Sequence, residues 1–173
     1  MDRFDLGTHT RTITTKSPEA QKYFNLGLNW CFGFNHEEGY KCFQRALEHD
    51  PDCAMAHWGM AYGAGPFYNL PWRHLGKQEA IEMTALCHNH VARAKSLCTN
   101  CSPAEKALIH ALSKRYQQPH PVPNEEFDRW DDSYADAMRE VYFANKDDLD
   151  VAALFAEALI TRTPWKLWNV KTG

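Results

Sequence analysis

The sequence predicts an all-α fold of paired antiparallel helices, and two observations carry this prediction. Serine, asparagine, aspartate and proline recur where helices would begin, and apolar residues recur with helical spacing between them. Small and large residues also alternate with the spacing of one helical hairpin, because small residues let two backbones approach while large ones fill the space beside them. The residues of this pattern are Tyr23, Leu26, Gly27, Trp30, Gly39, Phe43, Ala46 and Pro51.

The first helices can be placed from their end signals. Residues 1–16 are threonine-rich and are expected to form an extended or strand-prone arm. Ser17 caps a first helix that runs to about residue 32. Asn35 caps a second helix, and Glu38, three residues later, completes a capping box. That helix is expected to end near residue 49, because a proline follows.

The rest of the chain continues the helical pattern after one unusual connection. Residues 65–72 form an aromatic, proline-bounded loop, which is expected to pack on the body of the protein rather than face water. The helices around it are expected over residues 53–64, 77–97, 102–117, 125–144 and 147–161. The predicted organisation is therefore an extended arm, 1–16, and one helical domain, 17–173, whose last repeat is incomplete.

Composition narrows the function classes. The chain has 173 residues, of which 44% are hydrophobic and 13% aromatic, so it can bury a core. A net charge of −3 without a basic patch argues against nucleic acid or an anionic membrane as partner. There is no apolar run of spanning length and no secretory signal near the start. Scattered cysteines indicate reduced, buried thiols, so a cytoplasmic protein is expected.

The spacing of the small and large residues resembles the tetratricopeptide repeat (TPR), a helical hairpin of about 34 residues. The stretch 27–66 and the later Pro164-Trp165 motif are similar to the N-terminal part of longer, uncharacterised fungal and bacterial TPR proteins. The resemblance implies an α-α superhelix of about seven helices, whose first helices line a concave groove. It also implies which residues face that groove: Phe24, Leu28, Trp58 and Tyr62.

An apolar groove of this kind would bury an apolar helix or peptide, so the sequence favours a TPR-type interaction or scaffold module. A carboxylate clamp for chaperone tails is not expected, because Phe24 and Leu28 occupy positions where it needs polar or basic side chains. The arm 1–16, the loop 65–76 or a second copy of the chain could fill the groove instead. The sequence contains no motif for catalysis and none for a cofactor, which leaves enzymatic activity unassigned.

A different class of function follows from the edge formed by residues 34–38 and 65–72. First helices of successive repeats run parallel, so these two connections are expected on one edge of the molecule. A histidine and a carboxylate beside aromatic rings suit a small-ligand or metal-binding enzyme, or half of one. The alternative is plain helix capping with a solvated histidine. The residues concerned are Asn35, His36, Glu38, Asn69 and Trp72.

One cysteine pair has the spacing of a zinc site. Cys98 and Cys101 would need two further ligands, which Cys87 and either His88 or His90 could supply. An ordinary turn between two helices that happens to carry two thiols explains the same residues. No metal is therefore assigned from the sequence.

Overall fold

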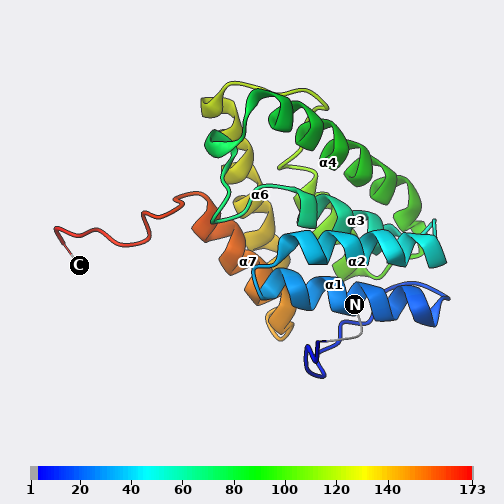
Figure 1. Cartoon of the computed structure of the whole chain (residues 1–173). Helices are drawn as coiled ribbons and strands as arrows, with labels where there is room; N and C mark the ends of the chain where they lie inside the picture. The colour runs from blue at the N-terminus through cyan, green and yellow to red at the C-terminus, as the bar shows by residue number, and fades with distance from the viewer. Residues whose placement is uncertain (1–3, 173) are drawn as a thin grey trace.

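The computed structural model describes residues 4–172 and confirms the all-α fold (Figure 1). No helix in this part of the chain is long and apolar enough to cross a membrane. Short 3-10 turns, η1 (Trp72–His74) and η2 (Cys98–Asn100), interrupt two of the connections. The described residues form seven α-helices: α1 (Pro18–Phe32), α2 (His36–His49), α3 (Ala54–Ala64), α4 (Lys77–Leu97), α5 (Pro103–Leu112), α6 (Asn124–Ala144) and α7 (Leu149–Thr161).

Local capping residues set most of these bounds. The hydroxyl of Ser17 accepts a hydrogen bond from a backbone amide of α1, and Asn35 Oδ1 accepts one from the amide of Glu38 at 3.2 Å. The predicted capping box at α2 is only half formed, because the Glu38 side chain pairs with Lys41 at 2.7 Å. Ser102 opens α5 with a complete box. The sequence therefore located the helix starts to within one or two residues.

The end of α5 differs from the prediction. The helix ends at Leu112 instead of continuing to about residue 117. After it, backbone amides bond three residues back, as in a 3-10 turn, including Arg115 N to Leu112 O at 3.1 Å. The tighter turn directs Arg115 and Tyr116 into the interior, where both are almost fully buried.

Small residues lie where the helices cross, as predicted. The ring of Phe43 on α2 is fully buried between Gly27 of α1 and Gly59 of α3. A Cβ atom on Gly27 would lie 2.6 Å from Phe43 Cε1, and one on Gly59 would lie 2.4 Å from Phe43 Cδ1. Ala46 on α2 is also fully buried. The helix backbones can approach only because these side chains are absent or small.

The helices pack in chain order, each against the next from α1 to α7. In addition, α1 packs on α3 and α3 packs on α5, so alternate helices form a row. Figure 1 shows α1, α2 and α3 lying side by side, with α6 and α7 across one end of this layer. The aromatic loop after α3 packs on the body, as expected, because Trp72 stacks on Phe127 of α6 at 4.1 Å between ring centroids.

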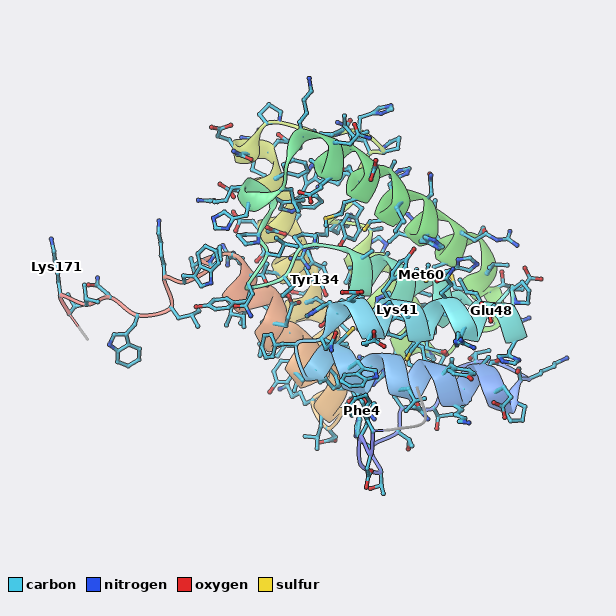
Figure 2. The ribbon with its side chains drawn as sticks, in the orientation of Figure 1. Phe4, Lys41, Glu48, Met60, Tyr134 and Lys171 are labelled. Atoms are coloured by element: carbon cyan, nitrogen blue, oxygen red, sulfur yellow. The ribbon has the colours of Figure 1, made fainter. Side chains whose placement is uncertain are left out.

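The described part of the N-terminal arm, residues 4–16, contains neither helix nor strand, and Gly7 within it has a positive φ of 78°. Arg11 Nη1 lies 2.8 Å from Asp148 Oδ1, at the start of α7. The backbone amide of Thr14 donates to Glu105 Oε1 at 2.6 Å, at the start of α5. The arm thereby ties together two helix starts that are distant in the sequence. Figure 2 shows Phe4 of this arm below α1, Tyr134 of α6 inside the body, and Lys171 far out on the C-terminal segment.

Candidate functional site

The residues expected to line an open groove are part of the core, which corrects that expectation. Phe24 and Leu28 of α1 and Trp58 and Tyr62 of α3 are at most 4% exposed. Trp58 stacks on Tyr62 at 5.0 Å between ring centroids. Other helices cover these rings: Phe24 packs on Phe43 of α2 and on Trp58, and α4 and α5 pack on α3. Residues of α7 line the same cavity as Tyr62. The apolar face is therefore used for folding.

The second predicted site, the edge formed by residues 34–38 and 65–72, is brought together only in part. His36 at the start of α2 stacks on Phe67 at 3.9 Å between ring centroids, so the two connections do meet. His36 is buried, not solvated. Asn35 caps α2, Asn69 is exposed, and Glu38 pairs with a lysine. Trp72 lies away from this edge, in the aromatic cluster on α6. Asn35 and His36 line a cavity of about 520 Å³ at this edge, and of the five predicted residues only His36 also lines a second cavity beside it.

This second cavity has a volume of about 310 Å³ and lies between the α1–α2 turn, the loop after α3, and α7. Its floor comes from the ends of α1 and α3, and one of its walls comes from α7. We call it the aromatic pocket, because ring side chains form most of its lining. The residues that line it are Cys31, Phe32, Phe34, His36, Tyr62, Phe67, Tyr68, Ala153, Ala156, Glu157 and Ile160.

The rim of the aromatic pocket carries a strained residue. Phe34 has φ of 61°, in the left-handed region, whereas its neighbour Gly33 has φ of −80°. A residue with a side chain loses roughly 1–2 kcal/mol in that conformation, and glycine does not. The chain thus places the ring, and not the glycine, at the strained position, and 54% of Phe34 is exposed. Backbone strain of this kind concentrates at functional sites.

The only carboxylate in the lining of the aromatic pocket belongs to Glu157 of α7. Its Oε1 accepts a hydrogen bond from the Thr161 hydroxyl at 2.7 Å and lies 3.9 Å from Arg115 Nη1. Its Oε2 is buried and has no hydrogen-bond partner. Arg115 cannot serve Glu157 alone, because its Nε donates to Asp131 Oδ1 at 2.9 Å. Two carboxylates therefore share one guanidinium in the interior.

Other polar atoms near this cluster also lack partners. Arg115 Nη2, the Tyr134 hydroxyl and Trp58 Nε1 are buried without a hydrogen bond. The Arg115 guanidinium carbon lies 5.1 Å from the centroid of the Tyr134 ring. Buried polar groups are nearly always paired, so a group of orphaned atoms indicates a place for water or a ligand.

Burial sets the protonation of the cluster. It raises the pKa of Glu157, and the charge of Arg115 only partly offsets this. Burial also opposes the charge on Arg115, but Asp131 and Glu157 hold its pKa above the ordinary value, so it stays a cation. Burial lowers the pKa of His36 to about 4, which leaves its ring neutral at pH 7. Glu157 is therefore the group of the pocket wall whose charge a ligand can change.

The candidate zinc ligands are not gathered into one site. The Cys87 thiol donates to the carbonyl oxygen of Ala61 at 3.5 Å, and His90 Nδ1 lies 2.9 Å from His57 Nδ1. Across residues 4–172 no group of three or more His, Cys, Asp or Glu side chains is close enough to hold a metal ion. Cys87 and Cys101 are buried thiols whose pKa values burial raises, to about 12 and about 11 respectively.

Sequence reasoning missed Glu157 and Arg115, the two charged residues of this site. A glutamate within a predicted helix and an arginine beyond a helix end are ordinary surface residues by pattern. Comparison with protein-family models, curated proteins and solved structures finds no match to this chain. What the structure defines is thus a class: an all-α protein whose described residues include an aromatic pocket with α7 as one wall.

Proposed function

We propose that the protein binds a small organic molecule in the aromatic pocket. The observation that carries this proposal is a cavity of about 310 Å³, lined by rings, with one unpartnered carboxylate oxygen on a residue of its wall. Ligand sites in proteins are mostly apolar cavities of roughly 300–1,000 Å³ with a few well-placed polar groups. The volume suits a compact molecule with one ring or a short chain.

Access to the aromatic pocket supports the same proposal. Phe34, Ala153 and Ala156 are exposed at its rim, whereas Cys31 and Tyr62 are buried at its floor. A compound could therefore enter past small alanine side chains and reach aromatic surface that is screened from water. The strained backbone of Phe34 holds an aromatic ring at the entrance, where ring contact with a ligand would offset the strain.

The test is a titration of the intact chain with three compounds that share one ring, namely 2-phenylethanol, 2-phenylethylamine and phenylacetate. Methyl NMR signals of Ala153, Ala156 and Ile160 report on the pocket, and at least one compound should shift them. Ala156→Trp should abolish the shift by filling the entrance, whereas Ala144→Trp, at an exposed position outside the pocket, should preserve it. No shift with any compound, or an unchanged shift in Ala156→Trp, would contradict small-molecule binding.

In Phe34→Asn the ligand affinity should change while the stability of the fold is nearly kept. Asparagine tolerates the left-handed conformation, so the free energy of unfolding should change by less than about 1 kcal/mol. The affinity for the bound compound should fall, because the ring at the rim is lost. Unchanged affinity would show that Phe34 takes no part in binding.

A protein-interaction role of TPR type is a second proposal, supported by a different part of the chain. Alternate helices pack in a row, as in helical repeats, and the segment after α7 exposes a cluster of apolar side chains, Trp165, Leu167 and Trp168. Figure 1 shows this segment leaving the helical body. The proposed contact surface is thus residues 164–170 and not the buried Phe24 and Trp58. Replacing the two exposed tryptophans with serine should abolish crosslinking to a partner in cell extracts, and unchanged crosslinking would exclude the segment.

A further inference from the structure

The charge of the aromatic pocket indicates which kind of molecule it takes. We infer that the ligand is an organic amine in its ammonium form, whose N–H donates to the carboxylate of Glu157 while its hydrocarbon part lies among the rings. This inference rests on the small-molecule function proposed above and adds the chemical class of the ligand. Four properties of the site support it: the count of buried charges, the hydrogen bonding of Glu157, the aromatic wall and the absence of a cation among the described lining residues.

The first property is the count of buried charges behind the wall. Arg115 contributes one positive charge, whereas Asp131 and Glu157 contribute two negative charges when both are ionised. Arg115 is 1% exposed and bonds directly to Asp131, so its hydrogen bonding goes mainly to that partner. If both carboxyls ionise, the more distant contact from Arg115 to Glu157, at 3.9 Å, leaves one negative charge without a direct partner, and burial accordingly raises the pKa of Glu157. A buried charge without a partner is costly, and one added cation restores neutrality.

The second property is the hydrogen bonding of Glu157 itself. Thr161 occupies Oε1, whereas Oε2 is buried without a donor. An ionised carboxylate only accepts hydrogen bonds, so what Oε2 lacks is an N–H or O–H donor. A protonated amine supplies both that donor and the missing positive charge. Because burial raises the pKa of Glu157, an ammonium group at this place would also favour the ionised form of the carboxyl.

The third property is the aromatic wall. The rings of Tyr62, Phe67, Tyr68 and Phe32 face the same cavity as Glu157. The face of an aromatic ring attracts a cation, and this attraction is stronger where water is excluded. The tyrosine hydroxyls can donate a hydrogen bond, but the described lining residues offer no cationic side chain to a carboxylate or phosphate ligand.

An anionic ligand would need a cation in the lining, and the described lining residues include none. His36 is neutral at pH 7, since its pKa lies near 4. Arg115 does not line the aromatic pocket. Its Nη1 lies 3.9 Å from Oε1 of Glu157, which does line the pocket. A carboxylate ligand would therefore find no cationic side chain among the described residues of the wall.

The experiment compares the affinities of the intact chain for 2-phenylethylamine, 2-phenylethanol and phenylacetate at pH 7, read from the methyl signals of Ala156 and Ile160. The amine differs from the alcohol essentially in one charged group, and it should bind about ten-fold more tightly because a charge-assisted hydrogen bond replaces a neutral one. Phenylacetate should bind more weakly than the alcohol. This order of affinities is measured on the wild-type protein and tests the charge of the ligand without any variant.

Glu157→Gln keeps the volume of the side chain and removes its charge. It should lower the affinity for the amine about ten-fold while changing that for the alcohol by less than about two-fold. Glu140→Gln, the same change at an exposed position of α6, should alter neither affinity. Equal binding of amine and alcohol to the wild type would overturn the assignment of a cation and leave the pocket as a site for neutral molecules. Failure of all three compounds to shift the methyl signals would overturn the small-molecule function and this inference together.

Discussion

Gly59→Ala is expected to destabilise the protein, although alanine favours helix. A methyl group at this position would lie 2.4 Å from Cδ1 of Phe43, and real Cβ contacts essentially never fall below 3.0 Å. The ring cannot move away, because it is fully buried and Gly27 contacts its edge from α1. The added methyl group must therefore push α2 and α3 apart at this crossing.

Two opposing effects determine the magnitude. Overpacking a well-packed core costs about 1–3 kcal/mol. Replacing glycine with alanine inside a helix contributes about 0.5–1 kcal/mol of stability in the opposite direction. The net loss in the free energy of unfolding should therefore be about 0.5–2 kcal/mol, so the sign of the change separates packing from helix propensity.

The assay is urea unfolding followed by circular dichroism, with Gly33→Ala as the matched control. Gly33 has an ordinary φ of −80°, and a Cβ there would meet its nearest atoms at 3.4 Å, so this change should be neutral or stabilising. In a double variant with Phe43→Leu, the loss from Gly59→Ala should shrink, because the smaller side chain leaves space for the methyl group. A stabilising Gly59→Ala would refute the packing of the glycines against Phe43.

Three further predictions concern the buried charges and the histidines. Arg11→Met should free residues 4–16 for limited proteolysis and cost about 1–3 kcal/mol, because its carboxylate partners at the start of α7 lose a charged donor; an arm that stays protected would contradict this. Asp131→Asn should cost about 3–5 kcal/mol in urea unfolding, since it removes the direct partner of the buried Arg115; a change below 1 kcal/mol would argue against the pair. Burial lowers the pKa of His57, and that of His90 to about 4, so both bind protons on unfolding below about pH 6.5. The stability they contribute is complete above pH 6.5 and is lost as pH falls toward 4. In His90→Gln the urea midpoint should therefore depend less on pH across this range.

Much of the helical framework could be predicted because its signals are local. Ser17, Asn35 and Ser102 accept hydrogen bonds from amides a few residues away, so neighbouring residues determine where these helices begin. The position of Gly27 at a helix crossing could also be predicted, because Gly27 and Phe43 lie within one helical hairpin whose geometry repeats in many proteins.

The prediction of an open groove was wrong because exposure is not a local property. Phe24 and Trp58 have the spacing of groove residues, yet they pack on each other, Phe24 also packs on Phe43 of α2, and both are buried. The left-handed backbone of Phe34 could not be predicted either, because a turn of this kind ordinarily has glycine in that conformation, and Gly33 is the adjacent residue.

The sequence by itself thus determined the helices, their order and the close contact of α1, α2 and α3. Only the tertiary structure decided that α7 closes a ring-lined cavity and that Glu157 shares Arg115 with Asp131. Glu157 and Arg115 are 42 residues apart (157 − 115), and no short-range pattern relates them. Their contact depends on how whole helices pack, and no local pattern of the sequence encodes that packing.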